Sequence, residues 1–217
     1  MFVKDRMTPQ PLVAVTPDTP ITEAQRLMQV HNIRHLPVVA DHALLKGLLT
    51  RGAVIRAIPW SAASLSVLET QYILSKITVG KVMLHDVITT TEEVPVEEAA
   101  RIMVDNRVTC LPVVRQTTLV GIITDIDLLS VTMEMLGARR PGLRLSVTVP
   151  NRVGEMARLS TAIAQAGGNL TAFGSWKGEH PGEPFGIVLK VDRIPKARLI
   201  AAIEGLEGVE ILDVRET

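Results

Sequence analysis

The sequence predicts an α+β protein: two β-α-β-β-α repeats packed as a pseudo-twofold pair, followed by a ferredoxin-like β-α-β-β-α-β domain. Three observations lead to this prediction. A stretch of about 24 residues recurs after about 75 residues. Helical and strand periodicities follow one another in the same order in both copies. A turn-rich, basic segment, residues 136–142, separates these copies from a third region with its own alternating pattern.

The repeat aligns residues 16–39 with residues 91–114, and roughly ten of about 24 positions are identical. Upstream, Met7 pairs with Met83 at nearly the same offset. The identities include Pro20 with Pro95, Glu23 with Glu98, Ala24 with Ala99, Arg26 with Arg101, Met28 with Met103 and the whole LPVV. This agreement exceeds what shared helical periodicity alone produces.

Each copy is expected to begin with a short strand, at residues 13–15 and at residues 87–89. A helix follows, with Pro20 or Pro95 near its first position, where a missing amide costs nothing. Apolar residues then recur at helical spacing. The strand LPVV, a polar turn, a third strand (GLL or GII) and a second helix complete the unit.

A unit of about 55 residues with a one-sided sheet is too small to bury its apolar face alone. The two copies are therefore expected to pack face to face, with two related clefts between them. The first repeat is assigned to residues 1–58 and the second to residues 79–135, joined by a linker at residues 59–78. A helix is expected at residues 66–75.

A second linker, residues 136–142, ends in Pro141 and Gly142, which break helices. The domain that follows, residues 143–217, opens with a stretch that alternates like a strand. Residues 154–168 have helical spacing, with glycines as a C-terminal stop. Two strands, a helix and a final strand complete the ferredoxin-like order.

Charge and cysteine content argue against several functions. Lys plus Arg and Asp plus Glu are balanced at 23 each, so no large charged face is expected to attract nucleic acid or a membrane surface. The single cysteine, Cys110, excludes an internal disulfide framework, fits a reducing compartment and lies in an apolar strand pattern that predicts burial. Neither a secretion signal nor a bilayer-spanning segment is recognisable, so a cytoplasmic location is expected.

No catalytic residue and no metal site are predicted, and no cofactor is expected to be required. The five histidines show no paired spacing with cysteine or carboxylate that would build a zinc site. No phosphate-binding P-loop, GxGxxG run or GxSxG elbow occurs in the sequence.

The stretch GIITDID, residues 121–127, has two readings. Thr124 and Asp127 have the spacing of a capping box, which accounts for both without a ligand. The same helix N-terminus suits a phosphate, to which Thr124 adds a hydroxyl donor. The carboxylate of Asp127 suits the vicinal hydroxyls of a ribose, so a nucleoside phosphate satisfies both residues.

The repeated methionine, the EA pair in the helix, the LPVV strand and GIITDID resemble tandem CBS (cystathionine β-synthase) domains, also called a Bateman module, over residues 1–135. In that family the threonine and the aspartate contact the phosphate and ribose of an adenine nucleotide. The resemblance implies that Thr124 and Asp127 bind AMP, ADP or ATP as a regulatory ligand. It implies that the base pocket is lined by Val87, Val108 and Thr109.

The first copy departs from this pattern. Thr50 is kept, but Ala53 cannot accept a hydrogen bond from a ribose, and Arg51 changes the start of the helix. On the family pattern the Thr50 site is therefore expected to be weak or empty. Arg34 and His35 correspond in position to basic residues that reach phosphates in some CBS proteins; a solvated strand end is the alternative reading.

Residues 143–214 resemble an ACT domain. The stretch VPNRVGEMARL is similar to that family's first loop, in which an acid or amide and then a glycine hold an amino acid at a domain interface; Asn151 and Gly154 occupy those positions. Gly168 and Asn169 match the turn into the second strand. The resemblance implies an amino-acid site that involves Asn151, Gly154 and Asn169. The alternatives are a domain that only dimerises and an Asn151 that only caps the helix.

The order CBS, CBS, ACT is similar to that of the acetoin-utilisation accessory proteins of bacteria. The preferred hypothesis is a regulatory binding protein, not an enzyme, that forms a homodimer. Its CBS pair senses an adenine nucleotide, and its ACT domain senses an amino acid or joins subunits. One alternative is a small hydrolase that uses Asp125 and Asp127 near Thr124; another is a purely structural oligomerisation module.

Overall fold

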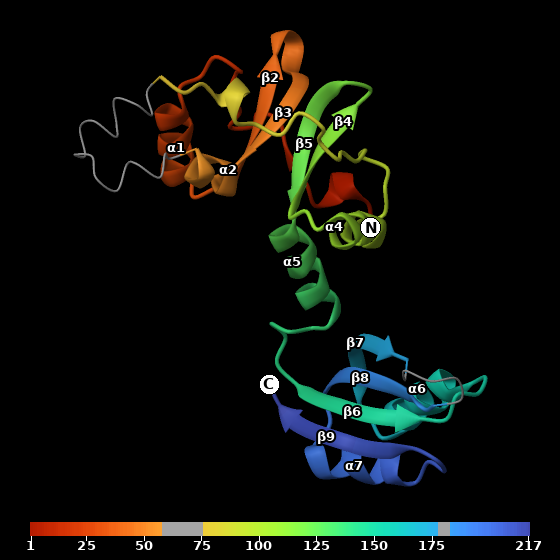
Figure 1. Cartoon of the computed structure of the whole chain (residues 1–217). Helices are drawn as coiled ribbons and strands as arrows, with labels where there is room; N and C mark the ends of the chain where they lie inside the picture. Colours follow the sequence, from red (N-terminus) through yellow and green to blue (C-terminus); the bar gives the residue numbers. More distant parts are fainter. Residues whose placement is uncertain (58–75, 178–182) are drawn as a thin grey trace. The chain divides into compact units, whose positions relative to one another are not determined.

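The computed structural model describes residues 1–57, 76–177 and 183–217 (Figure 1). The chain divides into two compact units, Met1–Leu128 and Leu129–Thr217. The α+β class expected from the sequence is confirmed by the mixture of helices and strands. The helix expected at residues 66–75 lies outside the described residues.

The unit Met1–Leu128 contains both repeats. The first repeat supplies α1 (Ile21–Val30), β2 (His35–Ala40), η2 (Asp41–Ala43), β3 (Leu44–Thr50) and α2 (Arg51–Arg56). The second supplies α4 (Val96–Asn106), β4 (Cys110–Arg115), β5 (Thr118–Thr124) and α5 (Asp125–Met135), whose last turns pass into the second unit. The segments that lead into the repeats contain η1 (Val3–Asp5), β1 (Thr8–Pro9) and η4 (Val79–Lys81).

The helices α1 and α4 form for the same reasons. Pro20 and Pro95 are their N-caps, so each proline stands where its missing N–H costs no helical bond. Each helix buries one stripe at helical spacing; the buried residues are Ile21, Ala24 and Met28 in α1 and Val96, Ala99 and Met103 in α4. The two copies therefore share a buried face as well as a sequence.

The strands expected at residues 13–15 and 87–89 are wrong in extent. Only single parallel bridges form, Val15 with Val38 and Thr90 with Val113. Directly after Val15 the chain turns, because the N–H of Thr16 donates to Thr19 Oγ1 at 3.0 Å. This turn leaves no room for a longer ladder.

The sheet of this unit is built from two hairpins. β2 pairs with β3, β4 pairs with β5, and all pairs are antiparallel. The hairpins carry bulges at equivalent places, between Val38 and Val39 and between Val113 and Val114. The repeats therefore share register, which makes position-by-position comparison between them valid.

The segment that leads into each repeat packs against the other repeat. β1 pairs antiparallel with β5, with Thr8 opposite Ile122. In the equivalent place, Leu84 bridges Leu48 of β3, with N–H to carbonyl distances of 3.0 and 2.9 Å. The segment before the first repeat therefore pairs with the second repeat, and the segment before the second repeat pairs with the first.

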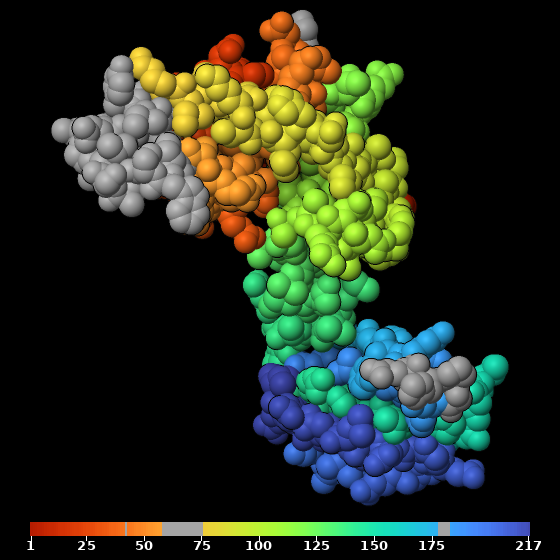
Figure 2. Space-filling view, viewed as in Figure 1, coloured from red at the N-terminus to blue at the C-terminus, as the bar shows by residue number. Residues whose placement is uncertain are grey.

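The hydrophobic cores show the same exchange. Val3 is buried in the core of the second repeat, and Val79 is buried in the core of the first. Figure 2 shows the yellow segment that begins at Lys76 lying beside the orange residues of the first repeat. In packing terms, residues 3–7 complete the second repeat and residues 77–83 complete the first.

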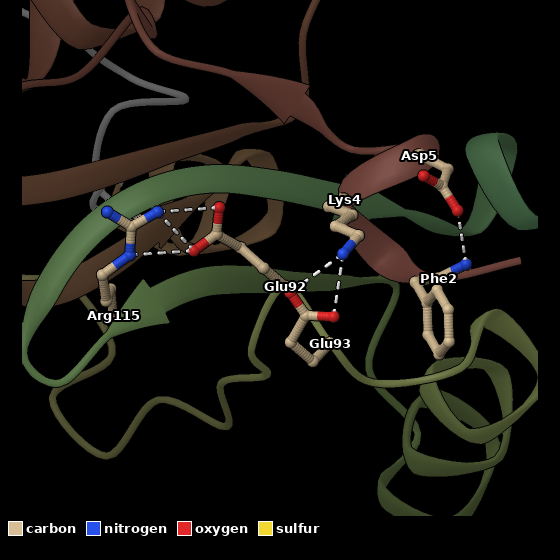
Figure 3. Close-up of polar contacts among 6 residues, drawn as sticks. All are labelled: Phe2, Lys4, Asp5, Glu92, Glu93 and Arg115. Carbon is tan, nitrogen blue, oxygen red and sulfur yellow. Dashed lines mark hydrogen bonds and ion pairs between the residues drawn. The ribbon is translucent and has the colours of Figure 1, made fainter.

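Polar contacts hold the N-terminal segment against the second repeat (Figure 3). Lys4 Nζ lies 2.9 Å from Glu93 Oε2, beside the pair that Arg115 forms with Glu92 at 2.8 Å. These ion pairs are largely exposed, so each contributes little stability. Their position shows that η1 lies along the loop that precedes α4.

The unit Leu129–Thr217 has the order β6 (Leu143–Val149), α6 (Glu155–Gln165), β7 (Asn169–Trp176), β8 (Phe185–Asp192), α7 (Lys196–Glu204) and β9 (Glu210–Glu216). Its sheet has the strand order β7-β8-β6-β9, and all pairs are antiparallel. This is the β-α-β-β-α-β order expected from the sequence. The core includes Leu145, Leu159, Leu189 and Leu199.

Candidate functional site

Two cavities of the unit Met1–Leu128 are lined by Thr50 or by Thr124, and their volumes are about 390 Å³ and about 360 Å³. The first, the Thr50 cavity, is lined by Thr50, Arg51, Val87, Arg107, Val108 and Thr109. The second, the Thr124 cavity, is lined by Pro11, Val13, Ile33, Thr124, Ile126 and Asp127. Arg34 and His35 line both cavities. Each cavity is large enough for part or all of a small ligand.

The structure corrects the expected grouping of the site residues. Val87, Val108 and Thr109 do not line the cavity that contains Thr124 and Asp127; they line the Thr50 cavity. The reason is the exchange of leading segments, because β1 runs along β5 and brings the chain that follows it to the Thr124 end. The first repeat therefore contributes apolar residues to the Thr124 cavity, among them Val13 and Ile33.

At the start of α5, the carboxylate of Asp127 holds Thr124. Asp127 Oδ2 accepts from the N–H of Thr124 at 2.8 Å and from its hydroxyl at 2.7 Å. The first of these bonds is the carboxylate half of a capping box. Within the described residues nothing donates to Asp127 Oδ1, and a carboxylate oxygen has two lone pairs. Asp127 can therefore bind Thr124 and still accept from a ligand hydroxyl.

At the start of α2, Thr50 acts as the cap without an acid. Its Oγ1 accepts from the N–H of Ala53 at 3.1 Å. The hydroxyl is an acceptor in the first repeat and a donor to Asp127 in the second. The helix of the first repeat therefore begins normally with alanine at the position of the acid, so helix capping alone gives no need for Asp127.

Arg34 and His35 connect the two repeats. Arg34 Nη2 donates to Asp125 Oδ1 at 3.2 Å, and His35 Nε2 lies 3.0 Å from Thr109 Oγ1. Burial lowers the pKa of His35, the charge of Arg34 lowers it further, and Asp125 opposes both effects in part. The imidazole is therefore held in its neutral form at neutral pH, between the two cavities.

Cys110 lies beside these residues but does not supply a nucleophile. Its side chain is buried, as the sequence predicts. Burial raises the pKa of the thiol to about 12, and the charges of Asp125 and Asp127 add to the effect. The thiol stays protonated and packs as a small apolar group.

The described part of the chain comprises residues 1–57, 76–177 and 183–217. These ranges contain no group of three or more His, Cys, Asp or Glu side chains that could hold a metal ion. They also contain no helix long and apolar enough to cross a bilayer.

The three residues expected to bind an amino acid are not brought together within one chain. Asn151 and Gly154 follow the end of β6, which lies opposite Phe185. Asn169 begins β7 opposite Asp192, at the far end of β8. Seven residues of strand separate these two ends of the sheet, which is about 20 Å.

The alternative reading of Asn151 as a helix cap is wrong. The N-cap of α6 is Gly154, whose φ of 95° lies in the left-handed region that favours glycine. The first turn is organised by Glu155, which is buried and accepts from Arg152 and Arg158. The hydrogen bond from Arg152 is the main cause that lowers the pKa of Glu155, so this cluster is ionic and holds the loop.

Arg107 is a charged cavity residue that the sequence did not predict. It lines the Thr50 cavity from the end of α4. The repeat contains the signal that could have found it, because Arg107 aligns with Asn32. A long cation thus replaces a short neutral side chain.

The profile of the family described as CBS domain matches residues 3–59 and 79–134. The CBS domain-containing protein YhcV of Bacillus subtilis is 33% identical over 127 residues, which are 58% of this chain and 81% of YhcV. The inosine-5'-monophosphate dehydrogenase of Thermoplasma acidophilum is 34% identical over 117 residues, 54% of this chain. That match spans only 21% of the enzyme's own length.

Three solved structures share the fold of the CBS pair. The putative acetoin utilization protein AcuB of Vibrio cholerae has a TM-score of 0.53 and 27% identity, over 64% of this chain and 95% of that one. The CBS domain pair of protein MJ0100, in complex with 5-methylthioadenosine and S-adenosyl-L-methionine, has a TM-score of 0.51 and 28% identity, over 64% and 98%. CBSX2 in complex with AMP has a TM-score of 0.50 and 27% identity, over 64% and 98%.

The family profile covers nearly all of each repeat. Each of the three similar structures covers 64% of this chain. Two of those proteins are seen with adenosine-containing ligands. The chain belongs to the CBS domain family, of which it carries a tandem pair.

Proposed function

We propose that this chain is a regulatory protein whose CBS pair binds an adenine nucleotide in the Thr124 cavity. The observation that carries the proposal is the state of Asp127. One carboxylate oxygen binds Thr124, and the other has no donor among the described residues. In the first repeat, Thr50 caps the equivalent helix although Ala53 stands in the place of the acid. Capping therefore does not require Asp127, and its carboxylate is available to a ligand.

The lining of the Thr124 cavity suits the parts of a nucleotide. Val13 and Ile33 offer apolar surface to the base, Asp127 accepts from the ribose hydroxyls, and Arg34 offers a cation to the phosphate. The complexes of related CBS pairs with AMP and with S-adenosyl-L-methionine have adenosine in common. We therefore take AMP, ADP and ATP as the candidate ligands, with the adenosine part as the group recognised.

The proposal assigns binding rather than catalysis to this cavity. A hydrolase would need a carboxylate as general base, and each of the two candidates already makes a polar contact through one oxygen. Asp125 is paired with Arg34, and Asp127 binds Thr124. A regulatory role follows if the ligand favours one arrangement of the two repeats over another, because only differential affinity shifts an equilibrium.

We further propose that residues 143–217 form an ACT domain and that the protein is a cytoplasmic homodimer. The strand order β7-β8-β6-β9 leaves β7 and β9 as edges, with Phe173, Trp176 and Leu212 among the exposed apolar residues. Exposed apolar side chains on sheet edges favour association of two copies. Because Asn151 and Asn169 lie at opposite ends of the sheet, an amino-acid site that combines them would need two chains.

Thermal unfolding with AMP, ADP and ATP tests the nucleotide proposal. A ligand at 100 times its Kd stabilises the folded state by about 2.7 kcal/mol. With AMP, which has no di- or triphosphate chain, we expect a rise of several degrees in the melting temperature of the wild type and almost none in Asp127→Ala. The control Asp105→Ala removes an exposed carboxylate of α4 that is paired with Arg101, and it should keep the shift.

Two results would contradict the proposal: an undiminished shift with AMP in Asp127→Ala, or no shift of the wild type with any of the three nucleotides. The alternatives give different outcomes. A hydrolase would release product from ATP and magnesium above a control without protein. A purely structural module would show a changed oligomeric state in variants but no response to nucleotide.

A further inference from the structure

The two cavities differ sharply in charge. Three arginines, Arg34, Arg51 and Arg107, line the Thr50 cavity together with one carboxylate, Asp86. The charged residues of the Thr124 cavity are one arginine, Arg34, and one carboxylate, Asp127. The Thr50 cavity therefore has an excess of positive charge, whereas the positive and negative charges of the Thr124 cavity are equal in number.

The difference arises at equivalent positions. Arg51 follows Thr50 where Asp125 follows Thr124, and Arg107 ends its helix where Asn32 follows the other. Ala53 takes the place of Asp127. All three changes raise the charge at the Thr50 end, whereas only the last bears on ribose recognition.

The backbone of Arg107 adds an independent observation. Its φ is 54° and its ψ is 39°, in the left-handed region, and Asn32 has a φ of 51°. Asparagine tolerates this conformation, whereas a long side chain is disfavoured there. Arginine therefore occupies a position in the second repeat where asparagine, as in the first repeat, is the better tolerated residue.

The cations differ in their partners. Arg34 is paired with Asp125 at 3.2 Å. For Arg51 and Arg107 the described part of the chain provides no ion pair. Two arginines that line one cavity and have no carboxylate partner among the described residues are suited to bind a phosphate, because each guanidinium group can donate two parallel hydrogen bonds.

We propose that the Thr50 cavity binds the phosphate chain of a small phosphorylated compound, a di- or triphosphate group, without reading a ribose. Arg51 and Arg107 neutralise the chain, and Thr50 adds its hydroxyl. Ala53 removes the carboxylate that would repel it. The family pattern predicts that the Thr50 site binds a nucleotide weakly or not at all. On this proposal the cavity still lacks a group that binds a ribose, but it binds an anion. This goes beyond nucleotide binding at Thr124 and does not depend on Asp127.

Isothermal titration of the full chain with inorganic pyrophosphate and with tripolyphosphate tests the proposal. We expect binding that weakens with added salt, and a loss of about tenfold or more in affinity in Arg107→Asn and in Arg51→Gln. Arg107→Asn is the sharper variant, because asparagine fits the left-handed backbone and the unliganded melting temperature should hold or rise. Lower affinity in a protein of equal or higher stability excludes misfolding as the cause.

The matched control is Arg115→Gln. Arg115 lies on β4, is paired with Glu92 and lines neither cavity, so its replacement should leave anion binding unchanged. Wild-type protein that binds neither anion would overturn the proposal. Unchanged affinity in both Arg107→Asn and Arg51→Gln would also overturn it, because the binding would then lie elsewhere.

Two further titrations separate this site from the Thr124 site and identify the source of the phosphate chain. Adenosine, which has no phosphate, should bind Arg107→Asn as it binds the wild type; if it binds neither while pyrophosphate binding persists, the nucleotide proposal fails and this one stands. If ATP binds Asp127→Ala as tightly as tripolyphosphate does, nucleotides supply the chain. If only tripolyphosphate binds that variant, a free polyphosphate is the ligand.

Discussion

Thr50 and Thr124 occupy equivalent positions but use their hydroxyls differently. Thr50 accepts from the N–H of Ala53 at 3.1 Å, whereas Thr124 donates to Asp127 at 2.7 Å. A threonine that accepts caps a helix on its own. A threonine that donates to an acid fixes the position of that acid. The same residue type thus supports the fold in one repeat and orients a carboxylate in the other.

A prediction at this scale concerns pH. The pKa of His35 is lower in the folded protein than the ordinary value near 6.5, mainly because of burial. The unfolded chain therefore binds a proton at His35 more readily than the folded protein does. The contribution of this residue to stability is present above about pH 6.5 and is lost as the pH falls through that value towards the lower folded pKa.

The variant His35→Gln can keep the hydrogen bond to Thr109 and removes the titration. Urea unfolding of wild type and variant between about pH 8 and about pH 5 measures the difference. We expect the wild type to lose more stability than the variant on acidification. Parallel pH profiles would show that His35 does not titrate differently in the folded protein.

At the scale of elements, the exchange of leading segments decides which residues share a cavity. Helices and hairpin strands followed from local periodicity, because each element needs only its own pattern. Local periodicity does not predict which repeat a leading segment packs against, because the sequence pattern of the segment is the same in either case. For this reason Val87 and Thr124 were expected together and lie in different cavities. The charge of the Thr50 cavity was missed for the same reason, because it sums residues from both repeats.

The segment at Met83 and Leu84 lies so close to β3 that a methyl group added at Gly47 should lower the stability of the fold. A Cβ on Gly47 would lie 2.7 Å from the carbonyl oxygen of Leu84 and 2.7 Å from Met83 Sδ. The carbonyl is held by its bond to the N–H of Leu48, so it cannot move away cheaply. Gly47→Ala should lower the free energy of unfolding by about 1–3 kcal/mol.

Gly52→Ala is the matched control in the next element. Gly52 lies in α2, where a Cβ would meet the far end of Arg56 at 3.3 Å and Thr50 Oγ1 at 3.9 Å, an ordinary van der Waals contact. Alanine favours the helix, so this variant should be as stable as the wild type or more stable. Both are measured by urea unfolding. Equal stability of Gly47→Ala and wild type would show that Leu84 does not pack on β3 as described.

At the scale of the whole molecule, one chain combines two related cavities of unlike chemistry with a second unit that has its own core. On the two proposals made above, divergence within the repeat gives one protein sites for two different ligands. The asymmetry at Ala53 and Asp127 was visible in the sequence. Its consequence, a balanced cavity beside a cationic one, needed the arrangement of both repeats.

The central claim is that Asp127 makes the Thr124 cavity an adenine-nucleotide site and that Ala53 denies this role to the other cavity. The most direct test is the number of AMP molecules bound per chain, measured by isothermal titration in wild type, Asp127→Ala and Ala53→Asp. We predict one in the wild type, none in Asp127→Ala and a second in Ala53→Asp. One AMP still bound per chain in Asp127→Ala, with unchanged affinity, would contradict it.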